Sequence, residues 1–234
     1  MKTWNTNNGY RITRVIHRRS NVFLISNNDR HILVDSNLKR HRKLLDTNLR
    51  KLGITKLDVL ILTHTHFDHA GNAAYIQKKY RPKVIVHQSE SAWLHDGNSP
   101  LPHGSFFITR LIYSLFSSFV QRNVRYESCL PDFEVLDNFS LADFGINGYI
   151  VHTPGHSPGM MCVIVDNDIA LVGDAMINHI PGTIFPSFAE DTDQLILSWG
   201  RLLDSNCRLF LPAHGEAIER EKLLRHYNKR INIS

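Results

Sequence analysis

A cluster of metal-binding side chains directly after an apolar run is the feature that most constrains this chain. His64, His66, Asp68 and His69 fall within six consecutive positions, and residues 57–62 before them have the length and branched-residue content of a buried strand. His64 and His66 are two residues apart, so both can project to one side of the chain where the strand ends. The loop that follows can carry Asp68 and His69 round to face them. Imidazole suits zinc, copper, iron or nickel, and an added carboxylate suits a hydrolytic centre.

Three residues farther along the chain are candidates to complete such a site. His152, Asp174 and His214 each come at the end of a short, apolar, strand-like run. A metal ion needs three or four ligands, and two ions need more, so ligands outside the first cluster are required. Strand ends are where proteins built on sheets place chemistry, because the rigid strand holds the ligand and loops surround it. The sequence therefore offers a set of seven candidate ligands.

The order and context of these residues resemble the metallo-β-lactamase-fold hydrolase superfamily. The resemblance is carried by His64-x-His66-x-Asp68-His69, by His152 before the segment Thr153-Pro154-Gly155-His156-Ser157-Pro158-Gly159, by Gly173-Asp174, and by Pro212-Ala213-His214-Gly215. Val34-Asp35-Ser36 also looks like the aspartate motif that ends an early strand in this superfamily. The motifs are specific for the superfamily and poorly specific for substrate.

The resemblance implies a fold and a ligand assignment. The expected fold is α/β, a four-layer αββα sandwich of two mixed β-sheets flanked by helices, with the metals at one edge of the sheets. One ion would be held by His64, His66 and His152. A second ion would be held by Asp68, His69 and His214, and Asp174 would bridge the two. The ions are expected to be divalent, with zinc first and iron or manganese as alternatives.

This site implies hydrolysis by a metal-activated water. Two divalent ions about 3.5–4 Å apart can share a hydroxide that forms near neutral pH and attacks a carbonyl or phosphoryl centre. Asp68 is the candidate catalytic residue, because its carboxylate can accept or relay a proton. We expect a small-molecule substrate with an ester, thioester or lactone bond, and substrate contacts stay unassigned. Typical β-lactamases of this fold carry Cys or Ser where Asp174 stands, which argues against antibiotic hydrolysis.

Two other chemistries remain open at this stage. A mononuclear non-haem iron oxygenase of the same fold would use two histidines and one carboxylate and would leave some of the seven residues unused. A phosphodiesterase or nuclease of the same superfamily is the other alternative.

Neighbouring polar residues can orient the ligands. Asp35, Thr63 and Ser157 are candidates to hold imidazole rings, although a turn cap explains Asp35 equally well. His156 is interpreted as a turn residue or as a support for a ligand, not as an eighth ligand. His179 could reach substrate, but a role in a surface loop is its more ordinary interpretation.

Composition bounds the remaining possibilities. The 234 residues suit one large domain, residues 1–234, and 42% hydrophobic residues is ordinary for a globular protein. The first residues lack the apolar core of a signal peptide, and the three cysteines form no Cys-x-x-Cys pair, so the cytoplasm is the expected location. No run of about 18 apolar residues predicts a membrane span. The net charge of +5 slightly favours anionic partners, with nucleic acid a less favoured partner than a small molecule.

One apolar segment is not explained by the metal site. Residues 105–120 are rich in Phe and lie within a predicted helical insertion at about 100–130, bracketed by prolines. The segment is interpreted as a core helix or a homodimer contact. A lid over the metals is the alternative, and attachment to a membrane surface is less favoured because its polar face has few basic residues.

The remaining elements follow from local patterns. Short apolar runs between Asn, Ser and Asp turns predict strands over residues 11–17, 22–26, 31–35, 83–87, 133–136, 149–152, 161–165 and 169–172. Helical spacing predicts helices over residues 39–52, 193–203 and 216–231.

Overall fold

Two mixed β-sheets pack face to face in this chain. The computed structural model describes residues 1–106, 108–109, 111, 114–115 and 124–231. The first sheet, in spatial order, contains β1 (Lys2–Asn5), β2 (Arg11–Arg18), β3 (Ser20–Asn27), β4 (Arg30–Val34), β5 (Val59–Ile61), β6 (Lys83–His87) and β7 (Phe133–Val135). The second contains β13 (Ile218–Glu219), β12 (Leu209–Gly215), β11 (Ile169–Asn178), β10 (Met161–Val165), β9 (Gly148–His152) and β8 (Asn138–Ser140).

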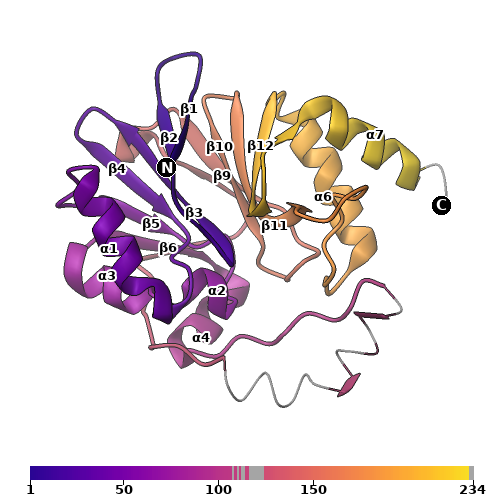
Figure 1. The fold of residues 1–234 in the computed structure, drawn as a ribbon, viewed down its shortest axis with the longest axis horizontal. Helices are drawn as coiled ribbons and strands as arrows, with labels where there is room; N and C mark the ends of the chain where they lie inside the picture. Colours follow the sequence, from indigo (N-terminus) through magenta and orange to yellow (C-terminus); the bar gives the residue numbers. More distant parts are fainter. Residues whose placement is uncertain (107, 110, 112–113, 116–123, 232–234) are drawn as a thin grey trace.

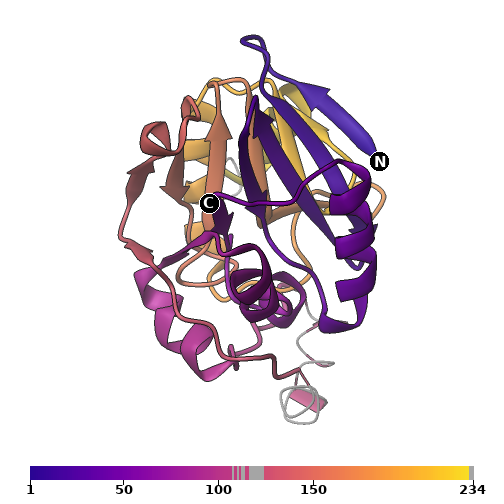
Figure 2. The same cartoon turned by 90° about the vertical axis from the view of Figure 1, so that its left-hand side faces the viewer.

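Helices cover the outer faces of both sheets. Between strands of the first sheet the chain forms η1 (Lys39–His41), α1 (Arg42–Lys51), α2 (Phe67–Ala70), α3 (Ala73–Tyr80) and α4 (Gln88–Asp96). Between and after strands of the second sheet it forms η2 (Ala142–Phe144), α6 (Thr192–Asp204) and α7 (Arg220–Ile231). In Figure 1, α1 and α3 lie on one side of the paired sheets and α6 and α7 on the other. Figure 2, viewed from the side of α1 and α3, shows the first sheet in front of the second. The described chain therefore has four layers in the order α, β, β, α.

Alternation along the strands divides the apolar side chains among three core clusters. Val59 and Ile61 of β5 are buried between the two sheets, while Leu60 between them packs in the cluster beneath α1. Leu45 and Leu49, one helical turn apart on α1, face the same cluster. A third cluster lies between the second sheet and α6, where Trp199 is fully buried and donates from Nε1 to the carbonyl of Ala175 at 2.7 Å.

The predicted fold class is confirmed, and most element boundaries lie within about two residues of the prediction, but two differ by four residues or more. The predicted helix over 216–231 begins only at Arg220, because Ile218–Glu219 first pairs as β13 with β12. The strand predicted to end at residue 172 runs on to Asn178, so Asp174 lies within β11. The pairing of β11 with β12 is irregular around Gly173, which has φ +47°. A Cβ at Gly173 would come within 2.6 Å of Thr63 Oγ1, so glycine allows β11 to approach the end of β5.

Much of the apolar segment 105–120 lies outside the described residues. Of its described side chains, Phe106 packs edge-on against Phe185, with ring centroids 6.0 Å apart. None of the helices that the structure describes combines the length and apolar character that a bilayer-spanning segment needs.

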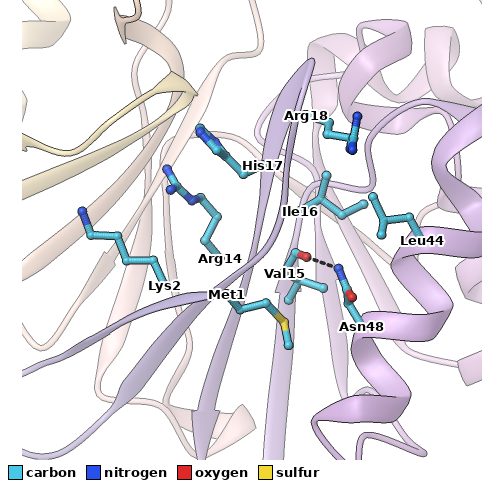
Figure 3. A pocket seen from close by; sticks show the side chains of 9 residues that line it. All are labelled: Met1, Lys2, Arg14, Val15, Ile16, His17, Arg18, Leu44 and Asn48. Atoms are coloured by element: carbon cyan, nitrogen blue, oxygen red, sulfur yellow. Dashed lines mark hydrogen bonds between the residues drawn. The ribbon is translucent and has the colours of Figure 1, made fainter.

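A surface cavity lies beside β2, near the point where β1 begins (Figure 3). Its volume is about 470 Å³, and Lys2, Arg14, His17 and Arg18 contribute to its lining. Glu216 accepts ion pairs from Lys2 and Arg14 at 3.4 and 3.0 Å, so part of this positive charge is balanced locally. None of the described residues that line the cavity is a candidate metal ligand.

Candidate metal centre

The ends of β5, β11 and β12 meet at one edge of the two sheets. After β5, the chain turns into the four-residue helix α2. The backbone N–H of Met161 on β10 donates to the carbonyl of Thr63 at 2.7 Å and ties the second sheet to the end of β5. The side-chain amide of Asn21 on β3 donates to the carbonyl of Pro212 on β12 at 2.9 Å. These contacts hold the loops that carry candidate ligands from both sheets against one another.

Three imidazole rings form the first half of the cluster. His64 and His66 follow β5, and His156 comes from the turn-rich loop after β9. Their ligand atoms lie within 4.8 Å of one another, and His156 Nε2 is 3.1 Å from His66 Nδ1. All three side chains are buried. This is the geometry of a three-histidine site on one metal ion.

The second half of the cluster combines two histidines and a carboxylate. The ligand atoms of Asp68, His69 and His214 also lie within 4.8 Å of one another. His214 Nε2 is 3.6 Å from Asp68 Oδ2, and His69 Nε2 is 3.9 Å from Asp68 Oδ1. His214 is the most exposed of these three side chains, at 15%. The second group therefore has an accessible side at His214.

Asp174 lies between the two halves. Its Oδ2 is 3.3 Å from Nε2 of His214 and 3.5 Å from Nε2 of His156. Its Oδ1 is 3.6 Å from Nε2 of His69. One carboxylate thus faces ligands of both groups, which is the position that a bridging carboxylate requires.

The structure corrects the prediction for His152. Its Nε2 lies 2.8 Å from the carbonyl oxygen of Pro158, and its ring stacks on His87 of β6 with centroids 4.0 Å apart. The cause is the strand order: β10 lies between β9 and β11, so the end of β9 faces β6 and not the site around Asp174. The loop after β9 then carries His156 to the place predicted for His152. His156, interpreted from the sequence as a turn residue or a support for a ligand, thus lies among the candidate ligands themselves.

Unpartnered polar atoms at the centre of the cluster test whether a metal fits. Among the described residues, His64 Nε2, His69 Nε2 and Asp174 Oδ1 are buried side-chain atoms without a hydrogen-bond partner. Buried polar groups are almost always hydrogen-bonded, so three neighbouring buried atoms without a hydrogen-bond partner need an explanation. Nitrogen and carboxylate oxygen donors suit zinc and related divalent ions. The residues present fit a metal centre.

Hydrogen bonds on the far side of two rings point the ligand atoms inward. Asp35 Oδ2 is 2.9 Å from His69 Nδ1, so an Nδ1–H donated to the carboxylate leaves Nε2 free for a metal. Asp35 is held in turn by the backbone N–H of Thr63 at 2.9 Å. His156 Nδ1 is 2.9 Å from the carbonyl of Phe188, which leaves His156 Nε2 facing the cluster in the same way. Asp35, predicted as either a turn cap or a support, contacts a candidate ligand directly.

Burial keeps the first three histidines neutral. Burial, with the neighbouring imidazoles adding to it, lowers the pKa of His66 and of His156 to about 4. The same causes hold the pKa of His64 well below 6.5. Neutral imidazole is the form that binds metal ions, so these rings are ready to bind at neutral pH.

Carboxylates dominate the electrostatics of the second group. Burial opposes protonation of His69, but the charges of Asp35 and Asp174 outweigh it and raise the pKa of this histidine well above 6.5. Burial also opposes ionisation of Asp174, but the nearby imidazoles of His214, His69 and His156 hold its pKa well below 3.8. A cluster with ionised carboxylates attracts positive charge at its centre, which a divalent cation supplies.

Two residues near the cluster have no signal in the sequence. Arg19, between β2 and β3, donates from Nε to Asp68 Oδ2 at 3.1 Å, with its side chain 53% exposed. Glu90, in the first turn of α4, is buried against the backbone of the ligand loops.

His179, considered in the sequence as a possible substrate contact, is exposed beside His214, with ring centroids 5.9 Å apart.

Comparisons with known proteins place these features in a family. A model of the metallo-beta-lactamase superfamily matches residues 16–214. The probable metallo-hydrolase YqgX of Bacillus subtilis is 26% identical over 68% of this chain and 66% of its own length. An atrochrysone carboxyl ACP thioesterase of Passalora fulva is 26% identical over 90% of this chain and 54% of its own length. The chain thus spans about two thirds of the length of the first of these relatives and about half of the second.

A solved structure supports the same assignment at the level of the fold. The BLEG-1 B3 metallo-beta-lactamase superposes with a TM-score of 0.69 at 20% identity, over 93% of this chain and 97% of that one. The two mixed sheets, the histidine and aspartate cluster at their edge and the matching family model lead to one conclusion: the chain belongs to the metallo-beta-lactamase superfamily.

Proposed function

We propose that this chain is a zinc-dependent hydrolase that holds two divalent ions and cleaves an ester, thioester or lactone bond in a small-molecule substrate. The observation that carries the proposal is the convergence of His64, His66 and His156 with Asp68, His69 and His214 around Asp174, with ligand atoms left unpartnered at the centre. A structural zinc site closes with four ligands, whereas seven convergent donors suit a catalytic pair of ions.

The residues divide into two sets around the bridging carboxylate. His64, His66 and His156 would hold one ion, and Asp68, His69 and His214 the other. When bound, the ions supply polarisation of the scissile carbonyl and activation of a water molecule for attack. Asp35 keeps the Nε2 atom of His69 turned toward the site.

Asp68 is the candidate for proton transfer. It is buried, and charges on His69, His214 and Arg19 outweigh the effect of burial and lower its pKa. The carboxylate is therefore ionised at neutral pH and can accept a proton from an attacking water or relay one to the leaving group. Its contact with Arg19, which is half-exposed, places it on the accessible side of the cluster.

A thioester is the first substrate class to test. The thioesterase of Passalora fulva matches 90% of this chain and 54% of its own length at 26% identity, and this similarity supports a carbonyl substrate. We propose to load the purified protein with zinc and to screen generic thioesters, esters, lactones and phosphodiesters, each with and without a chelator. We expect hydrolysis of at least one carbonyl class that chelation abolishes and zinc restores.

Metal analysis of protein purified without added metal separates the alternatives. About two zinc ions per chain support the binuclear hydrolase, whereas one iron would support an oxygenase. Turnover that chelation leaves unchanged, or cleavage of phosphodiesters alone, would contradict the proposal.

A further inference from the structure

Glu90 connects the two loops that carry the three-histidine group. Its side chain is buried, with only 1% of the residue exposed, in the first turn of α4. We infer that Glu90 is a positioning residue that fixes the separation of the His64–His66 loop from the His156 loop and thereby sets the affinity of the first metal site. The inference rests on the proposed metal centre and extends it to a residue that contacts no metal.

One oxygen of the carboxylate holds the first loop. Glu90 Oε2 accepts from the backbone N–H of Thr65 at 2.5 Å and from its hydroxyl at 2.8 Å. Thr65 stands between His64 and His66, so its orientation determines where both rings project. Ser99 also donates from its hydroxyl to the carbonyl of Thr65 at 2.6 Å. Thr65 is thus held on both sides by buried hydrogen bonds.

The other oxygen holds the second loop. Glu90 Oε1 accepts from the hydroxyl of Ser157 and from the backbone N–H of Gly159 at 3.2 Å. Ser157 directly follows His156 in the sequence. A Cβ at Gly159 would come within 2.6 Å of Glu90 Cγ, so the glycine permits the close approach. Each carboxylate oxygen of Glu90 thus accepts two hydrogen bonds from one of the two loops, so the side chain connects both.

A neutral amide cannot reproduce these contacts. All four groups that face the carboxylate act as donors to it, while the amide of Gln carries one acceptor oxygen and one donor nitrogen. In Glu90→Gln the amide nitrogen therefore faces the N–H of either Thr65 or Gly159. One loop loses its support, and the spacing between the histidines of the two loops changes.

The test measures the affinity for each metal ion, not turnover. The purified full chain, loaded with Co²⁺ in competition with a chelator of known affinity, gives a dissociation constant for each ion and a visible absorption spectrum for its ligands. We expect Glu90→Gln to weaken binding of the first ion by about 10–100-fold, as is typical when a residue that orients ligands is replaced. We also expect a changed absorption spectrum, while the dissociation constant of the second ion changes by less than about threefold.

Asp46→Asn is the matched control. Asp46 is likewise a carboxylate with several hydrogen bonds, although it is only partly buried, and it accepts from Tyr75, Tyr80 and Lys79 in the packing of α1 on α3. This variant should lose stability and keep both affinities and the spectrum. Ser157→Ala removes one of the four donors to Glu90. It should also weaken binding of the first ion, by a smaller factor than Glu90→Gln does.

The outcomes separate this inference from the proposed function. If the unmodified protein binds two ions and both Glu90→Gln and Ser157→Ala bind them with unchanged affinity and spectrum, Glu90 only stabilises the fold and the inference is wrong. Should Glu90→Gln fail to fold, unchanged affinities in Ser157→Ala would overturn the inference by themselves. If the unmodified protein binds no ion, the proposed metal centre fails first and this inference falls with it.

Discussion

His156 lies in the candidate centre where the sequence predicted His152. His152 is the last residue of β9, and His156 is four residues farther along the chain. The sequence favoured His152 because it ends an apolar run, but the strand order turns its ring onto His87. His156 has no periodic signal, since a loop of Thr, Pro, Gly and Ser predicts no direction for its side chains. The packing of this loop against α6 decides which of the two histidines reaches Asp174.

The pair His156→Ala and His152→Ala tests this correction. We expect His156→Ala to weaken binding of the first zinc ion by at least about 100-fold, which exceeds the 10–100-fold loss typical of residues that only support ligands. His152→Ala should keep both ions, because its ring binds the carbonyl of Pro158 and not the cluster. Zinc titration against a chelator measures both variants. The opposite result, with the loss in His152→Ala alone, would restore the original assignment.

Asp68→Asn tests the proposed chemistry, once an activity has been found. The substitution keeps the size of the side chain and removes its charge and basicity. We expect turnover to fall by about 10²–10⁴-fold while the first ion stays bound. The measurement is kcat together with metal content of the same sample. Full turnover with two ions bound would make Asp68 a ligand without a role in proton transfer.

At the scale of elements, strands and amphipathic helices were predictable and the loops between them were not. The run at residues 83–87 is confirmed as β6, and Leu45 and Leu49 of the helix predicted over 39–52 form the buried side of α1. Both follow from local periodicity. The extension of β11 through Asp174 was not predictable, because its irregular pairing depends on how closely Gly173 packs against Thr63. The support from Glu90 likewise arises from contacts between distant segments.

The loop that presents His156 is fixed against α6. The hydroxyl of Ser198 donates to the carbonyl of Pro154 at 2.6 Å, and the backbone N–H of Asp191 donates to the carbonyl of Gly155 at 2.9 Å. Gly155 has φ +135°, and a Cβ there would come within 2.4 Å of the backbone nitrogen of Leu195. The loop can therefore lie against α6 only with glycine at this position.

Gly155→Ala should displace this loop from α6. We expect weaker binding of the first zinc ion and a loss of several kcal/mol in the free energy of unfolding, because backbone strain and a clash with backbone act together. Gly53→Ala is the control, since Gly53 also has positive φ (+72°) but has no atom within 4 Å of an added Cβ. It should lose only about 1–2 kcal/mol and keep its metal affinity. Equal effects of the two substitutions on zinc binding, measured by titration, would contradict the role of this loop.

The contact between α1 and α3 has a predictable dependence on pH. Burial raises the pKa of Asp46, but hydrogen bonds from Lys79, Tyr75 and Tyr80 outweigh it, so the pKa lies below the ordinary value of 3.8. A carboxylate with a depressed pKa stabilises the folded state above the unfolded-state pKa, and this stabilisation is lost as pH falls through the folded-state pKa. Asp46→Asn should therefore lower the free energy of unfolding by about 1–3 kcal/mol at pH 7, and by progressively less below about pH 4. Urea unfolding at a series of pH values checks this, and a constant difference would contradict it.

At the scale of the whole molecule, the metal centre joins the two sheets. His64, His66, Asp68 and His69 follow β5 of the first sheet, while His156, Asp174 and His214 belong to the second sheet and its loops. The resemblance carried by the seven-residue pattern implied the sandwich, and the structure has that fold, with two distant parts of the chain brought to one edge. The pattern did not predict which side chains would support the ligands. Their roles depend on contacts across both sheets.

Anomalous diffraction from crystals of the zinc-loaded protein, recorded at the zinc absorption edge, tests the central claim most directly. We expect two peaks about 3.5–4 Å apart. One should lie about 2.0–2.1 Å from nitrogens of His64, His66 and His156, and the other should be bound by Asp68, His69 and His214, with Asp174 reaching both. A single peak, or a first ion bound by His152 in place of His156, would contradict the account.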